Sequence, residues 1–172
     1  MWTWNKIEEE RNNFTQKLKN FLVFDIETII DKKMLEDIGE EKDLEKLENG
    51  EFMHFPFHKI VALSYMIIKD KIVKEFKSFS TDDESFLINK FWEKFKESHD
   101  IENGTVIKHF PVLITINGKN FDIPTIKVRS LKHANSLTDK NRRFVSIFLD
   151  KFDKWEQKYP RYTNKTTFYH ID

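Results

Sequence analysis

The chain has 172 residues and equal numbers of basic and acidic side chains, 29 of each, so its formal net charge is zero. This length can bury a core, to which 17 Phe and 4 Trp contribute large side chains, and no global positive field favours nucleic acid. The absence of cysteine excludes disulfides, thiolate zinc sites and cysteine nucleophiles.

Hydrophobic periodicity predicts the elements of the first half of the chain. A charged helix is expected over residues 5–19, followed by a buried strand near residues 21–27. Residues 31–51 form a charged insertion with apolar residues at helical spacing, which predicts a solvated helical excursion. Two strands, over residues 59–68 and 72–79, are expected to pair as a hairpin.

The sequence of the second half of the chain predicts a helix, a strand and a further helix. A helix over residues 81–98 starts at an N-capping cluster, and a β-branched strand follows over residues 112–116. After a turn at residues 117–120, Asp122 is expected to cap a helix that reaches His133. The order strand, hairpin, helix, strand, helix predicts an α/β fold, a mixed sheet flanked by helices, in a single domain spanning residues 1–172.

Two carboxylates, Asp25 and Glu27, stand at the end of the first predicted strand. Residues two apart on a strand share a face, so these like charges lie close together and need a counterion. No basic residue between Phe21 and Ile30 supplies one, which favours a hard divalent cation, Mg²⁺ or Mn²⁺. The alternative is a strand end whose acids simply face water.

A third acid, Asp122, lies just beyond the strand over residues 112–116. Helix capping and metal coordination use the same carboxylate oxygens. The spacing alone therefore does not decide between a structural cap and a metal ligand.

The segment Phe24–Thr28 resembles the first motif of the DEDD superfamily of 3′-5′ exonucleases, and Asn117–Asp122 resembles the second. The continuation over Phe121–Arg129 is most similar to the predicted exonucleases related to the proofreading domain of family B DNA polymerases. The resemblance spans residues 21–129 and implies a ribonuclease H-like architecture.

This resemblance implies hydrolysis of phosphodiester bonds at the 3′ end of single-stranded DNA or RNA with two metal ions. It assigns Asp25 to both ions, Glu27 to the first and Asp122 to the second. It also assigns contacts with the substrate to four residues: Thr28, Asn117, Phe121 and Arg129.

The third family motif, a Tyr or His followed by the fourth carboxylate, is not found in this sequence. Tyr169 and His170 stand at the wrong distance from Asp172, and Asp150 and Asp153 lack a suitably placed Tyr or His. We therefore expect a C-terminally truncated domain with one weak metal site and reduced or absent activity from this polypeptide alone.

Two alternatives to an active exonuclease stay open. In one, the chain binds nucleic acid without catalysis, and a second polypeptide supplies the missing motif. In the other, the fold is an inactive protein-interaction module whose contact surface is the insertion at residues 31–51.

The sequence also predicts a cytoplasmic protein without membrane association. Its first residues lack the apolar segment of a secretory signal. Its longest apolar run, residues 60–68, is too short to span a bilayer.

Overall fold

The structure is a computed structural model that describes residues 18–103, 106–149, 162 and 169–172. Residues 5–17 of the expected N-terminal helix and the acids Asp150 and Asp153 lie outside the described residues, and residues 18 and 19 are not helical. The elements are β1 (Asn20–Ile30), α2 (Lys32–Ile38), α3 (Glu41–Glu48), η1 (Phe55–Phe57), β2 (His58–Lys69), β3 (Ile72–Ser80), α4 (Glu84–Glu97), β4 (Asp100–Glu102), β5 (Val106–His109), β6 (Val112–Ile114), α5 (Asp122–Lys132), η2 (Ala134–Ser136), α6 (Asp139–Leu149) and β7 (His170–Ile171).

Five strands form one mixed sheet in the order β3-β2-β1-β6-β7. The pairs β1–β2 and β2–β3 are antiparallel, whereas β6 is parallel to both β1 and β7. The expected α/β fold, a mixed sheet with helices, is therefore confirmed. The short β4–β5 pair and α6 were not predicted.

The hairpin expected between β2 and β3 is also confirmed. Its turn residues Asp70 and Lys71 have φ values of 49° and 65°. Two successive positive φ angles match the right-handed twist of the flanking strands, which is why a two-residue turn suffices here.

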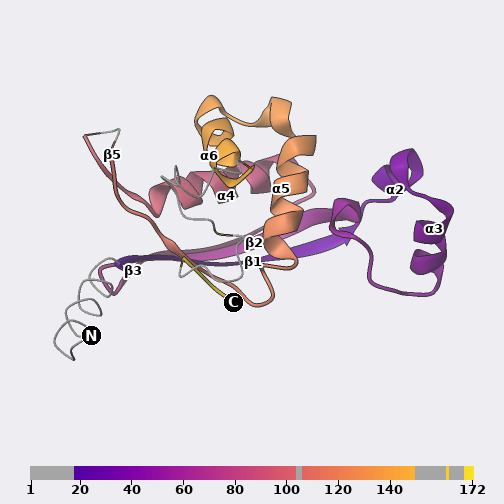
Figure 1. The fold of residues 1–172 in the computed structure, drawn as a ribbon, viewed down its shortest axis with the longest axis horizontal. Coiled ribbons are helices and arrows are strands. Elements are labelled where there is room, and N and C mark those ends of the chain that lie inside the picture. Colours follow the sequence, from indigo (N-terminus) through magenta and orange to yellow (C-terminus); the bar gives the residue numbers. More distant parts are fainter. Residues whose placement is uncertain (1–17, 104–105, 150–161, 163–168) are drawn as a thin grey trace, which may run out of the picture.

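The alternation of side chains along β1 gives the sheet two different faces. Leu22, Phe24 and Ile26 are buried and pack in the main core with residues of α4 and α5, including Phe91 and Ile126. Figure 1 shows α4, α5 and α6 together over this face of the sheet. Among the described elements, no helix covers the opposite face of the central strands.

The charged insertion forms two helices, α2 and α3, as its apolar spacing predicts. It stands beyond the end of β1 in Figure 1 and is held by a second, smaller core of Leu35, Met53 and Phe57. The insertion is therefore anchored to the sheet through the segment that leads into β2.

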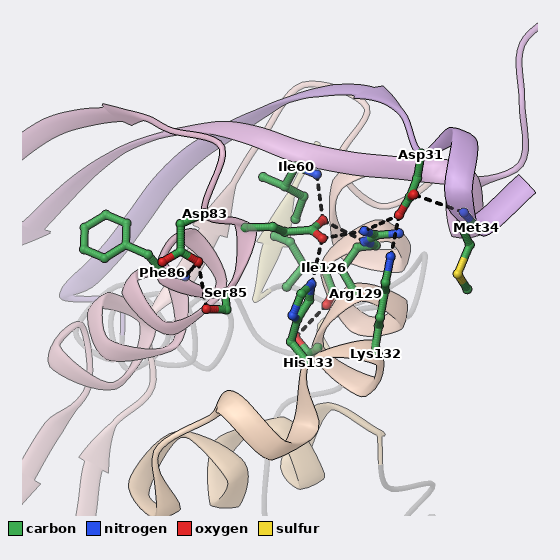
Figure 2. Close-up of polar contacts among 12 residues, drawn as sticks. Asp31, Met34, Ile60, Asp83, Ser85, Phe86, Ile126, Arg129, Lys132 and His133 are labelled. Atoms are coloured by element: carbon green, nitrogen blue, oxygen red, sulfur yellow. Dashed lines mark hydrogen bonds and ion pairs between the residues drawn. The ribbon is translucent and has the colours of Figure 1, made fainter.

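A buried ion cluster connects the N-cap of α2, strand β2, α4 and α5 (Figure 2). The Arg129 guanidinium donates from Nε to Glu84 Oε1 at 2.6 Å and from Nη2 to Asp31 Oδ2 at 2.7 Å. Glu84 also accepts the N–H of Ile60 at 2.7 Å and the Nε2–H of His133 at 2.8 Å. The cluster thus ties the orientation of α5 to the sheet.

The charges of this cluster are compensated inside the protein. Burial alone would raise the pKa of Asp31, but hydrogen bonds from Lys132, the Met34 N–H and Arg129 outweigh it and hold the pKa well below its usual value. The stabilisation from Asp31 is present above its unfolded pKa and is lost as pH falls through the lower, folded pKa.

Within the described residues, no helix is long and apolar enough to cross a lipid bilayer.

Replacing Arg129 by Met should destabilise the fold by roughly 3–5 kcal/mol, because two buried carboxylates lose their shared cation. Urea unfolding followed by circular dichroism measures this change. The control is Arg142→Ala, which removes a solvent-exposed pair with Asp139 and should leave the transition unchanged. If Arg129→Met unfolds at the same urea concentration as the original protein, the proposed role of the ion cluster is contradicted.

Candidate active site

The two acids of β1 lie on the face of the sheet that the described helices leave uncovered. Asp25 and Glu27 are exposed and alternate with the buried residues Phe24 and Ile26. Asp25 lines a depression of about 550 Å³ on this face, together with Val23, Ser64, Met66, Phe76 and Ile114. The strand therefore places both acids on the same face of the sheet, as the sequence predicts.

A β-bulge directly follows Glu27, and β1 continues to Ile30, three residues beyond the strand that the sequence predicts. Glu27 pairs with Ala62 and Thr28 with Ile60, so Val61 has no counterpart on β1. Bulges increase strand twist locally and re-aim the neighbouring side chains, and they occur often beside active sites. The bulge separates the part of β1 that carries Asp25 and Glu27 from the part that carries Thr28.

The carboxylate of Asp122 reaches across to β1. Its Oδ1 accepts a hydrogen bond from the Ile26 N–H at 3.2 Å. The strand β6 pairs with β1 only as far as Val23 and Ile114, so this carboxylate supplies a partner to β1 beyond the end of β6. Asp122 thereby lies beside Ile26, the residue between Asp25 and Glu27.

The expectation that Asp122 caps α5 is wrong. Phe121 is the N-cap residue, without a side-chain cap, and Asp122 is the first residue of the helix. The carboxylate binds the β1 backbone because long-range pairing with a strand edge outcompetes the local cap. This arrangement cannot be read from the helix sequence alone.

The charge around Asp122 is unfavourable to its ionised form. Burial is the main cause that raises the pKa of Asp122 to about 6; the negative charges of Asp25 and Asp172 contribute to this rise, and the Ile26 N–H opposes it. Three carboxylates therefore share one electrostatic neighbourhood. The sequence predicts that Asp25, Glu27 and Asp122 converge on one cation; the charges that act on Asp122 are those of Asp25 and Asp172, and the shared metal site stays a prediction.

Sequence reasoning assigned no role to Asp172. Its Oδ1 accepts from the Gly118 N–H at 2.6 Å and from Thr115 Oγ1 at 2.8 Å, and its Oδ2 accepts from the Lys119 N–H at 3.3 Å. Asp172 therefore holds the loop between β6 and α5. The sequence signal that could have indicated a role for Asp172 is its position directly after a strand. The carboxyl ends of parallel strands meet at one edge of a sheet, so residues that follow them lie close together.

The same loop depends on two of its own residues. Asn117 adopts a left-handed φ of 58°, and its carbonyl oxygen accepts from the Phe121 N–H at 3.0 Å. A Cβ on Gly118 would lie 2.3 Å from Thr115 Oγ1, so only glycine fits there. Asn117, an expected substrate contact, is exposed and shapes the turn that delivers Asp122.

Two other expected substrate contacts meet around His58. The Thr28 hydroxyl lies 2.9 Å from His58 Nδ1, and the Phe121 ring meets the imidazole edge to face, with centroids 4.9 Å apart. The segment that follows Glu27 and the residue that precedes Asp122 are therefore linked through one histidine.

The fourth expected substrate contact, Arg129, lies elsewhere. Its side chain is about 1% exposed and its guanidinium binds Glu84 and Asp31 inside the ion cluster of Figure 2. Because these bonds occupy the guanidinium, we assign Arg129 to the support of α5 rather than to substrate binding.

Residues 50–172 match a family described as predicted 3′-5′ exonucleases related to the exonuclease domain of PolB. The chain belongs to this family. The match contains Asp122 and its loop, whereas Asp25 and Glu27 precede it. A search of curated proteins gives no match.

The residues of this PolB-related exonuclease domain suit a hard cation in their chemistry. Within the described part of the chain, no three or more acidic or His side chains are already arranged as a metal site. The donors are nevertheless carboxylate oxygens, which Mg²⁺ and Mn²⁺ prefer. A cation would neutralise the charges of Asp25 and Asp172, which add to burial in raising the pKa of Asp122.

Replacing Asp122 by Asn should stabilise this exonuclease domain at neutral pH. The folded pKa of Asp122, about 6, exceeds its ordinary value of 3.8, so ionisation costs stability as pH rises from about 4 through 6. Asn keeps the acceptor for the Ile26 N–H without the charge. Urea unfolding without divalent ions should show a gain on the order of 3 kcal/mol at pH 8 and almost none at pH 4.

The control for this prediction is Asp37→Asn, which neutralises an exposed acid of α2 and should give no pH-dependent gain. A difference between Asp122→Asn and the original protein that is the same at pH 4 and pH 8 would refute the charge explanation.

Proposed function

We propose that this protein is a metal-dependent 3′-5′ exonuclease domain that acts on the 3′ ends of single-stranded DNA or RNA. The observation that carries the proposal is the contact of Asp122 with Ile26, between the two acids of β1. The family match supports the exonuclease class, and the substrate and the metal are our inference.

In this proposal Asp25, Glu27 and Asp122 hold Mg²⁺ or Mn²⁺. The bound cations would activate water and stabilise the leaving 3′ oxygen. The protein's own contribution is to fix the acids on rigid elements, since β1 is paired on both sides before Asp25 and α5 is tied to the sheet by Arg129. Such preorganisation is what a metal-dependent hydrolase requires of its scaffold.

The residues around the acids would orient the nucleic acid. Asn117 is exposed on the loop before α5, and Phe121 presents part of its ring beside the Asp122 backbone. We propose that Phe121 packs against the terminal sugar or base, and that Asn117 contacts the same nucleotide. Thr28 acts through His58, to which its hydroxyl is bound.

A second candidate is a nucleic-acid-binding module of the same fold without turnover. It is favoured by the lack, among the described residues, of a ready cluster of three metal ligands. Only three family acids are identified in the sequence, so we expect cleavage to be slow. Binding and hydrolysis therefore need to be measured separately.

The test is incubation of excess protein with a 5′-labelled single-stranded oligonucleotide and Mn²⁺. Stepwise shortening from the 3′ end is expected, and a chelator should stop it. Asp25→Asn and Asp122→Asn should each slow shortening by roughly 100-fold or more through loss of a metal ligand. Asp37→Asn, at an exposed acid of α2, should leave the rate unchanged.

A circular single strand distinguishes an exonuclease from an endonuclease, because it offers no free end. Cleavage of the circle at the rate of the linear strand would contradict the exonuclease assignment. Manganese-dependent binding of linear strands without shortening would support the second candidate, and a protein that neither binds nor cuts would refute both.

A further inference from the structure

Phe52 is a large aromatic side chain left in solvent beside the candidate active site. Its exposed fraction is 74%, although apolar rings are more often buried. One face of the ring stacks on the imidazole of His58, with centroids 5.1 Å apart and the planes inclined by 29°. An edge-to-face contact with Phe121, at 5.5 Å, fixes it from a second side.

The backbone that presents Phe52 is firmly anchored. The next residue, Met53, is 2% exposed in the small core with Leu35 and Phe57. Its carbonyl oxygen accepts from His58 Nε2–H at 3.0 Å. Phe52 is therefore held in place as part of an aromatic platform, which we define as Phe52, His58 and Phe121.

The aromatic platform touches both segments that carry the site acids. His58 is bound to the hydroxyl of Thr28, the residue after Glu27, and Phe121 directly precedes Asp122. The platform is consequently attached to residues that adjoin Glu27 and Asp122 in the sequence.

We propose that Phe52 is a substrate-binding residue, on which an unpaired base at or next to the 3′ end of the nucleic acid stacks. This inference rests on the proposed function and extends it to a residue outside both acid-bearing motifs. The stacked base would cover the exposed face of Phe52, while His58 supports the opposite face.

A nucleobase fits this platform better than an aliphatic group. Planar bases stack on aromatic rings whatever their sequence, and each such stack contributes roughly 1–3 kcal/mol to single-strand binding. A stacking platform also selects for unpaired ends, because a paired terminal base already stacks within its duplex. The proposal therefore predicts a preference for single strands over blunt duplexes.

The experiment uses the full chain and a ten-nucleotide single strand with 2-aminopurine at its 3′ end. Calcium replaces manganese so that binding is observed without hydrolysis. Stacking on Phe52 should quench 2-aminopurine fluorescence in the original protein and in Phe52→Trp, whereas Phe52→Ala should lose the quenching. The affinity of Phe52→Ala should fall by roughly 5- to 150-fold.

A second oligonucleotide, with abasic sugars at its last two positions, separates stacking from backbone contacts. Phe52→Ala should bind this abasic strand with the same affinity as the original protein, because the strand has no terminal base that could stack on Phe52. The matched control is Phe86→Ala, which removes an exposed aromatic ring from α4 that packs on Phe79 and should not alter quenching.

The outcomes distinguish this inference from the proposed function. If the original protein binds the strand but Phe52→Ala retains both affinity and quenching, the role of Phe52 is refuted and the exonuclease proposal stands. If Phe52→Ala weakens binding of the abasic strand equally, the residue supports the fold rather than a base. If the original protein shows no calcium-dependent binding of any strand, both inferences fail.

Discussion

The hydrogen bond between the Asp122 carboxylate and the Ile26 N–H is the contact on which the candidate site depends. It joins the start of α5 to the central strand at the point where β6 no longer pairs with it. A carboxylate placed there is buried, close to the charge of Asp25, and has a pKa of about 6. The ionised form of Asp122 is thus destabilised in the folded protein. Such perturbed groups are common where a protein binds a cation or performs chemistry.

The rest of the molecule holds that contact in place. The ion cluster around Arg129 fixes α5 against β2 and α4, and Trp92 Nε1 of α4 donates to Ser130 Oγ of α5 at 2.8 Å. From the opposite side, Asp172 holds the loop that leads into α5 through the Gly118 N–H. Figure 1 shows the last described residues beside this loop. Two segments far apart in sequence therefore determine where Asp122 lies.

Much of the fold follows from sequence because its signals are local. Alternation in β1, the left-handed turn residues Asp70 and Lys71, and the apolar spacing of α2 and α3 each specify an element without reference to the rest of the chain. The site was predictable only in part. Strand alternation placed Asp25 and Glu27 on one face, but the binding of Asp122 to β1 depends on where β6 stops pairing. The burial of Arg129 and the contacts of Asp172 likewise depend on tertiary packing that no local pattern encodes.

The central claim is that Asp25 and Asp122 share one cation. Carbon-13 NMR of the Asp122 carboxyl group, titrated with and without saturating Mg²⁺, tests it most directly. The account predicts a midpoint near 6 without the ion and one below the ordinary 3.8 with it, and a much smaller response to the ion in Asp25→Asn. A midpoint that Mg²⁺ leaves unchanged, or that responds equally when Asp25 is replaced, would contradict the account.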